Sequence, residues 1–442
     1  MSHPAPSAAP DMSHHWLPFT PNRDFRADPK LFVRAEGVHF YTPTGRPVLD
    51  ACSGLFTTPA GHGRREIADA VHRQLLELDF TSSFQRSHPK AFEAADRIAA
   101  LTPEGLDKIF FCNSGSEAVD TAMKMALAYH RARGEGSRTL FVSRERAYHG
   151  VNFGGVALSG LANNRRWFGH GLPTAVHMRH TQQPDGRFTP GQAEGGADLA
   201  DDLARIVQLH GAETIAACFV EPIAGSTGCL VPPVGYLQRL RQICDQHGVL
   251  LVFDEVITGF GRTGRAFAAE TFAVTPDLMT MAKAITNGAQ PMAAVAASAA
   301  VHQAVVEDSA AGPAANEFFH GYTWSAHPAA CAAAVAALDI YAAEGLFERA
   351  QQMSAYFLEA LFSLKDIGVV TDIRGHGMMG GLDVDADGAP GARGHALQKR
   401  LYDNGVHVKT TGDSAILAPA FVMTADQIDQ AIGGLRKTLQ SF

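Results

Sequence analysis

A lysine, an acid pair and a serine-rich turn are the side chains of this sequence best placed to do chemistry. Lys283 comes two residues after the apolar run at 278–281. Burial there would lower the pKa of its amine toward the neutral form that attacks carbonyl carbons. Asp254 and Glu255 follow another apolar run, where α/β proteins commonly place ligand-binding groups. The turn NSGSE at 113–117 opens a helical stretch, whose first N–H groups favour an anion.

Each of these features also has an ordinary structural interpretation. A single lysine is most often a solvated surface residue. The acid pair fits a metal site, a helix cap, or a carboxylate that hydrogen-bonds a protonated ring nitrogen of a cofactor. No histidine lies close enough in sequence to strengthen the metal interpretation, so we predict no metal site. The NSGSE turn is equally a helix N-cap with its capping glutamate.

The elements expected around these residues alternate apolar strands with amphipathic helices, which predicts an α/β fold with a mostly parallel sheet. The expected strands are 108–112, 139–142, 215–220, 249–253 and 278–281, and the expected helices are 117–133, 201–210 and 236–247. Both ends of the chain differ from this pattern. We therefore expect a large domain over 77–328 and a small α+β domain built from 1–76 and 329–442.

Composition and charge place the chain among globular proteins that bind small molecules or other proteins. Hydrophobic residues make up 46% of its 442 residues and charged residues 19%, which excludes disordered and fibrous classes. The formal net charge of -8 disfavours a general nucleic-acid or anionic-membrane surface. The six cysteines are scattered without zinc-type spacing, so we expect them to be reduced and mostly buried.

We expect neither a secretory signal nor a membrane-spanning segment in this sequence. Residues 1–15 lack the basic start and apolar run of a secretory signal and are expected to form a flexible tail. The alanine-rich stretch 292–301 is too short to span a bilayer. A cytoplasmic location is the default prediction.

Six stretches, taken in order, resemble the class III aminotransferases, and most closely the omega-amino acid:pyruvate aminotransferases. They run across nearly the whole chain, and their order and spacing make the resemblance specific. The stretches are NSGSE at 113–117, AYHG at 147–150, VEPIAGSTG at 220–228, FDEVITGFGRTG at 253–264, AKAITNGAQPM at 282–292 and HGYTWSAHPAACAA at 320–333.

This resemblance implies the fold type I of pyridoxal 5'-phosphate (PLP)-dependent transferases, PLP as cofactor, and a homodimer or higher homo-oligomer with shared active sites. It implies that Lys283 holds the cofactor as a Schiff base and shuttles a proton, that Asp254 binds the pyridinium nitrogen, and that Tyr148 stacks on the ring. His149 would support Tyr148, or be a hydrogen-bonded structural histidine. The other implied contacts are Gly115 and Ser116 at the phosphate, Thr323 of the partner subunit, and Glu221 and Val256 in the pocket wall.

The predicted substrate site departs from the family pattern. Lys409 stands where close relatives carry an arginine that binds the substrate carboxylate, and lysine lacks the bidentate fork of arginine. Phe56 replaces a common tryptophan, Phe84 keeps a family aromatic, and Arg86 stands where an aromatic is frequent. We expect Arg86, Lys409 or both to bind the substrate anion, although Arg86 is equally interpretable as a solvent-facing interface residue.

The resemblance implies transfer of an amino group from an omega-amino acid or a primary amine to pyruvate by a ping-pong mechanism. Taurine or a diamine as donor is an alternative. A class III decarboxylase or aminomutase would share the cofactor site. A non-catalytic PLP-binding module is a remote alternative, because Lys283, Asp254 and Tyr148 are all present.

Overall fold

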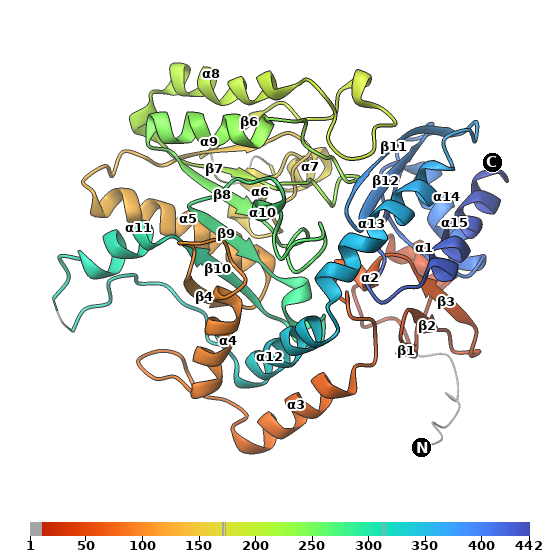
Figure 1. Ribbon diagram of the computed structural model, residues 1–442, viewed down its shortest axis with the longest axis horizontal. Coiled ribbons are helices and arrows are strands. Elements are labelled where there is room, and N and C mark those ends of the chain that lie inside the picture. The colour runs from red at the N-terminus through yellow and green to blue at the C-terminus, as the bar shows by residue number, and fades with distance from the viewer. Residues whose placement is uncertain (1–10, 170–171, 173, 313) are drawn as a thin grey trace.

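A seven-stranded sheet forms the centre of the molecule in the computed structural model, which describes residues 11–169, 172, 174–312 and 314–442. Its strand order is β4-β10-β9-β8-β7-β5-β6 (Figure 1). The strands are β4 (Lys108–Cys112), β5 (Leu140–Arg144), β6 (Ala175–Met178), β7 (Ile215–Val220), β8 (Leu250–Asp254), β9 (Leu278–Met281) and β10 (Ala293–Ala297).

The mostly parallel sheet predicted from the sequence is confirmed, and so are all five predicted strands to within two residues at either end. In the described sheet, β10 pairs antiparallel with both β4 and β9, whereas the strands from β9 to β6 pair parallel with one another. The sequence pattern predicts neither β6 nor β10, and the stretch that contains β10 is considered above only as a membrane segment. Its sequence AAVAA has few β-branched residues, but every residue is buried, and small side chains fit between the layers.

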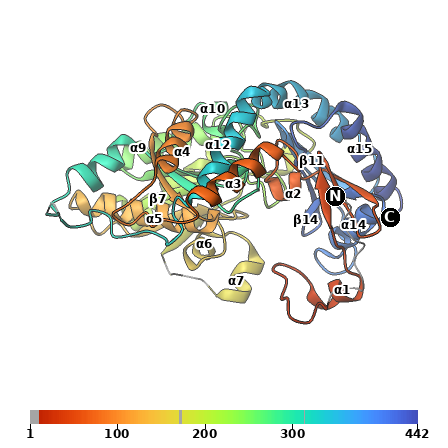
Figure 2. The same cartoon turned by 90° about the horizontal axis from the view of Figure 1, so that it is seen from below.

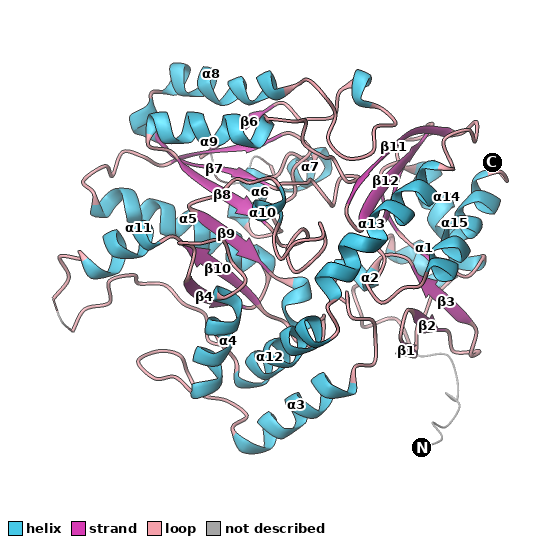
Figure 3. Ribbon diagram, in the orientation of Figure 1, coloured by secondary structure: helices cyan, strands magenta, loops and turns pink. Residues whose placement is uncertain are grey.

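Helices cover both faces of this sheet, and Figure 3 separates them from the strands by colour. The three predicted helices are confirmed as α5 (Gly115–Ala132), α8 (Asp201–His210) and α9 (Tyr236–His247). The other α-helices described between residues 53 and 302 are α2 (Ser53–Phe56), α3 (Arg65–Glu77), α4 (Pro89–Ala99), α6 (Phe153–Leu158), α7 (Ala162–Phe168), α10 (Ala268–Thr271) and α11 (Ala299–His302).

Two four-stranded sheets lie beside the central one and combine both ends of the chain, as the red and blue ribbons in Figure 1 show. One has the order β1 (Arg34–Glu36), β2 (His39–Tyr41), β3 (Pro47–Asp50), β13 (Val406–His407). The other has the order β11 (Val370–His376), β12 (Met379–Val384), β15 (Ser414–Leu417), β14 (Lys409–Thr411). The parallel pair β3 and β13 joins the two ends directly. The exact domain boundaries at residues 76 and 328 stay predictions.

The C-terminal helices are α12 (Pro328–Ala343), α13 (Leu346–Phe362), α14 (Ala392–Asp403) and α15 (Ala425–Leu439). In the described part of the chain, no single helix is long and apolar enough to cross a membrane. α12 and α13 reach that length only together, and they bend by 62°. All six cysteines are buried and free, as predicted.

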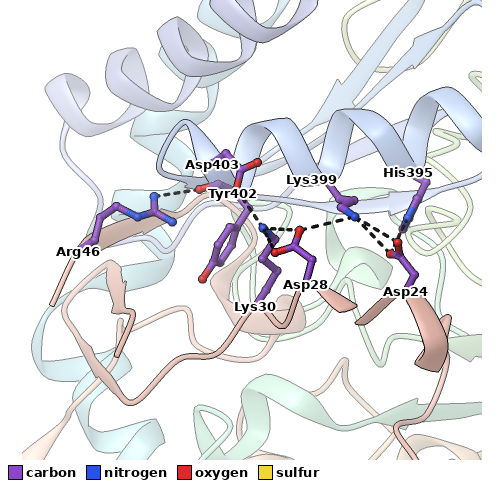
Figure 4. Close-up of polar contacts among 8 residues, drawn as sticks. All are labelled: Asp24, Asp28, Lys30, Arg46, His395, Lys399, Tyr402 and Asp403. Carbon is purple, nitrogen blue, oxygen red and sulfur yellow. Dashed lines mark hydrogen bonds and ion pairs between the residues drawn. The ribbon is translucent and has the colours of Figure 1, made fainter. Parts of the chain in front are cut away.

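The N-terminal segment is fastened to α14 by charged side chains (Figure 4). It contains α1 (Asn22–Ala27), which has no buried residue and lies at the edge of the molecule in Figure 2. Asp24 accepts from Lys399 at 3.2 Å and pairs with His395, and Lys30 reaches Asp403 at 3.1 Å. Such exposed pairs are individually weak and are screened by salt. Residues 1–10 of the expected flexible tail lie outside the described residues.

Candidate active site

A cavity of about 370 Å³ lies at the carboxyl edge of the central sheet. Its walls come from the segments that follow β4, β5 and β7, from the end of β8, and from the segment between β9 and β10. Ligands of open α/β sheets bind at this edge, because loops and helix N-termini meet there. The cavity brings together eight predicted site residues: Gly115, Ser116, Tyr148, His149, Glu221, Asp254, Val256 and Lys283.

The NSGSE turn is both a helix cap and a wall of this cavity. The Ser114 hydroxyl accepts from the Glu117 N–H at 3.2 Å, and the Glu117 carboxylate accepts from the Asn113 N–H at 2.7 Å. The N-cap interpretation is therefore confirmed. The first N–H groups of α5 have no partner within the helix, so the same turn can hold an anion. A Cβ at Gly115 would lie 3.1 Å from both methyl groups of Val256, so the turn packs closely against the segment after β8.

Asp254 is held by three hydrogen bonds at the end of β8. Its Oδ1 accepts from the Val256 N–H and from the Thr280 hydroxyl, both at 3.1 Å, and its Oδ2 lies 2.8 Å from Nδ1 of His149. Because a carboxylate only accepts, Nδ1 of His149 carries the hydrogen. The Nε2 atom of His149 is buried and has no hydrogen-bond partner in the described chain. This network fixes the direction of the carboxylate that faces the cavity.

The neighbouring acid, Glu255, has a different environment. It is fully buried and accepts from the N–H groups of Ala268 and Ala269 and from the Thr258 hydroxyl, each at 2.8 Å. It therefore caps α10, and burial raises the pKa of its carboxyl to about 7. Among the described residues, no group of three or more His, Cys, Asp or Glu side chains is arranged to hold a metal ion. One acid of the pair is structural, and the other faces the cavity.

Lys283 begins a short 3₁₀ turn, Lys283–Thr286, immediately after β9. Its φ of 52° lies in the left-handed region, which is costly for a residue with a Cβ and is found mostly at functional sites. Burial lowers the pKa of its amine from 10.5 to about 8, although the charges of Asp254 and Glu221 oppose this shift. A larger fraction of the amine is therefore neutral near physiological pH than in an exposed lysine.

The turn after Lys283 is tied to the N-terminal part of the chain. The Asn287 side chain accepts from the Ala60 N–H at 3.0 Å and donates to the Gly61 carbonyl at 2.9 Å. On the other side, the Tyr341 hydroxyl donates to the Ala284 carbonyl at 2.6 Å. These contacts fix the turn from both ends of the sequence and hold Lys283 in its strained conformation.

Glu221 connects the Tyr148 segment to the loop after β7. One of its oxygens accepts from the Tyr148 N–H at 2.9 Å, and the other accepts from the Gly225 N–H at 3.2 Å. Burial raises the pKa of its carboxyl. Tyr148 lies in the cavity wall, where its ring can cover a planar ligand.

The five remaining predicted residues do not line the cavity in one subunit. Phe56 is fully buried, whereas Phe84, Arg86 and Thr323 are exposed. Lys409 is partly buried, and its Nζ donates to the Ser226 carbonyl at 3.1 Å. Burial lowers the pKa of this amine, and the nearby Glu221 opposes the shift.

Similarity to known proteins decides the family. The profile described as aminotransferase class-III matches residues 24–439. The chain belongs to the class III aminotransferases. It is 50% identical to an omega-aminotransferase of Caulobacter vibrioides, over 98% of both chains. It is 45% identical to a beta-alanine–pyruvate aminotransferase of Pseudomonas aeruginosa, over 99% of this chain and 98% of that one.

A solved relative supports the same assignment for the fold. The structure of an (S)-enantioselective omega-transaminase from Thermomicrobium roseum superposes with a TM-score of 0.91 at 34% identity, over 98% of this chain and 97% of that one. The predicted PLP-dependent transferase fold of type I is confirmed. Class III aminotransferases use PLP, so this chain is a PLP-dependent transaminase and the non-catalytic alternative is wrong.

The residues of the cavity fit this cofactor. A helix N-terminus suits the phosphate, a fixed carboxylate suits a pyridinium nitrogen, and a lysine of lowered pKa suits an aldehyde. The sequence pattern does not predict the supporting roles of Thr280, Asn287 and Tyr341, because these side chains act only through their neighbours. A threonine in the otherwise apolar strand LMTM was the one available signal, because a polar side chain inside a buried strand needs a hydrogen-bond partner.

Proposed function

We propose that this class III aminotransferase transfers the amino group of an omega-amino acid or a primary amine to pyruvate by a ping-pong mechanism. The observation that carries the proposal is the placement of Lys283 and Asp254 in one cavity, with the amine pKa lowered to about 8. The names of the two relatives support the donor class and, for one of them, pyruvate as acceptor.

In this proposal, Lys283 attaches the cofactor through its Nζ and afterwards moves the proton of the donor carbon. When bound, PLP supplies an electron sink for the electrons left on that carbon. Asp254 keeps the ring nitrogen protonated, His149 orients Asp254, and Tyr148 stacks on the ring. Gly115 and Ser116 hold the phosphate, and Glu221 and Val256 complete the wall.

We assign the substrate anion to Lys409 first and to Arg86 second. Lys409 lies close enough to Glu221 and Lys283 for their charges to affect one another's pKa, whereas Arg86 is exposed. Phe56 and Phe84 are assigned to the substrate pocket of the assembled enzyme. A lysine in place of a carboxylate-gripping arginine favours less directional anion binding.

We also propose a homodimer in which Thr323 of the partner subunit completes the phosphate site. Exposed aromatic side chains support such an interface: Phe84 is 52% exposed, Phe319 is 92% exposed and Trp324 is 60% exposed. Phe84 and Phe319 line the same surface hollow, and exposed apolar side chains gathered in this way commonly mark subunit contacts. The cytoplasmic location stays a prediction.

A donor panel tests the proposed function. β-Alanine, 4-aminobutyrate, taurine, putrescine and 1-phenylethylamine are each supplied with pyruvate, and alanine formation is measured. β-Alanine, 4-aminobutyrate or the simple monoamine 1-phenylethylamine is expected to react fastest. A clear preference for taurine or putrescine would replace the proposed donor class, and release of carbon dioxide without alanine would point to a decarboxylase.

Borohydride reduction of the holoenzyme, followed by peptide mass spectrometry, tests the attachment site. The mass of the reduced cofactor is expected on Lys283. A label on any other lysine would overturn the assignment.

A further inference from the structure

Four polar side chains outside the cavity form hydrogen bonds between α5 and the loop that precedes α12, which contains residues 318–325. We call Thr121, Lys124, His320 and Tyr322 the His320 cluster. Nε2 of His320 lies 2.9 Å from the Thr121 hydroxyl, and Nζ of Lys124 lies 3.3 Å from Nδ1 of the same ring. The Tyr322 hydroxyl donates to the Glu117 carbonyl at 3.2 Å and lies 3.4 Å from the Thr121 hydroxyl.

The donors and acceptors of the His320 cluster have a defined order. An ammonium group can only donate, so Nδ1 of His320 accepts from Lys124 and Nε2 carries the ring hydrogen. Nε2 then donates to the hydroxyl of Thr121, which is fully buried. The Thr121 hydrogen is left for Tyr322 or for the Cys112 sulfur at 3.4 Å. Every member therefore has a compatible role.

The same loop also contacts β4. The His320 ring stacks on Phe110, with centroids 5.7 Å apart and planes 7° from parallel, and Phe318 packs edge-on against Phe110 at 5.9 Å. The loop runs past β4 on its way to α12 (Figure 1). β4 and α5 lie on either side of the cavity turn at 113–116. The loop therefore contacts the elements before and after that turn.

We infer that the His320 cluster is a positioning device for the cofactor phosphate. It holds the β4–α5 turn, with Gly115 and Ser116, in a fixed position relative to the loop that carries Thr323. In a dimer, the turn would contact the phosphate of its own subunit and Thr323 would contact the phosphate of the partner, so the cluster would keep these two contacts in register. This inference rests on the proposed function, in which Thr323 reaches the phosphate in the partner subunit. None of the cluster residues touches the cavity itself.

The test uses the full-length chain freed of cofactor and titrated with PLP. Tyr322→Phe and Thr121→Val each remove a hydroxyl, and His320→Phe keeps a ring to stack on Phe110. Each is expected to weaken PLP binding about fivefold, the effect of losing roughly one hydrogen bond. Amide exchange at 318–325 should accelerate, while the C-terminal half of α5 stays unchanged. Thr121→Ser should restore both values.

Tyr129→Phe is the matched control, since it removes a hydroxyl from the same helix outside the cluster. It is expected to change neither the affinity nor the exchange. In a double-mutant cycle, Tyr322→Phe and Thr323→Ala should be non-additive if the cluster acts through Thr323. Unchanged PLP affinity in all three cluster variants, or full additivity with Thr323→Ala, would overturn the inference. Failure of the unaltered protein to bind PLP would instead refute the proposed function.

Discussion

Nδ1 of His149 lies 2.8 Å from Oδ2 of Asp254, although the two residues are 105 positions apart in the sequence. The histidine was predicted to support Tyr148 or to be a hydrogen-bonded structural residue. The contact supports the second interpretation and identifies Asp254 as the hydrogen-bond partner of His149. The consequence is that the carboxylate, and any ring nitrogen that it binds, has its direction set by a buried imidazole.

His149→Phe is expected to lower kcat/KM by roughly ten- to a hundredfold, because a hydrogen bond to a charged group contributes about 1.5–3 kcal/mol. Thr280→Val removes a second donor to the same charged carboxylate, and its longer bond of 3.1 Å should contribute at the lower end of that range, about tenfold. Steady-state kinetics and the visible absorbance of the bound cofactor report both effects. Activity at the wild-type level in both variants would mean that Asp254 needs neither partner.

The two adjacent acids should respond differently to loss of charge. Asp254→Asn is expected to fold normally and to lose most of its turnover, because the amide no longer holds the ring proton. Glu255→Gln should keep its turnover per folded molecule but lose about 1–3 kcal/mol of unfolding free energy, since one buried N–H loses its acceptor. Urea unfolding and kinetics on the same samples separate the two. Loss of turnover in Glu255→Gln, together with normal turnover in Asp254→Asn, would instead assign the contact with the cofactor ring to Glu255.

Lys283→Met should stabilise the cofactor-free protein below pH 8. The amine has a pKa of about 8 in the folded protein and an ordinary value of 10.5, so between these values the unfolded chain holds more protons. Stability from this group therefore rises with pH across that window, and the penalty is complete below pH 8. The variant's advantage is expected to be about 1–3 kcal/mol near pH 7.

Urea unfolding of the cofactor-free wild type and of Lys283→Met, at about pH 7 and about pH 10, checks this prediction. The advantage should shrink at the higher pH. An equal advantage at both values would show that packing, and not the charge, is responsible.

Lys409 and Arg86 can be separated by their effect on the acceptor. Lys409→Ala is expected to raise the KM for pyruvate roughly tenfold, because a partly buried cation is lost. Arg86→Ala should have a smaller effect, and Lys409→Arg should keep or lower the KM. If neither alanine variant changes the KM for pyruvate or for the amine, both assignments are wrong.

The sequence by itself determined five of the seven strands of the central sheet, and the family. Runs such as IAACFV and LLVF are apolar on both faces, and only a strand covered on both sides by helices suits them. Through the family resemblance, the motif order alone predicts that Lys283, Asp254 and Tyr148 share one site. Local patterns suffice for such features, because periodicity and strand-end position are properties of short segments.

Tertiary structure alone decided the rest. Adjacent acids at a strand end look alike in sequence, but the pleat turns them to opposite sides, so Glu255 caps α10 while Asp254 faces the cavity. The strand β10 is set by its place between β4 and β9, because alanine has little strand preference of its own. The positive φ of Lys283 and its contact network depend on Asn287 and Tyr341, which hydrogen-bond segments distant in the chain. These features depend on packing between segments that are distant in the sequence, and a local sequence pattern carries no information about such packing.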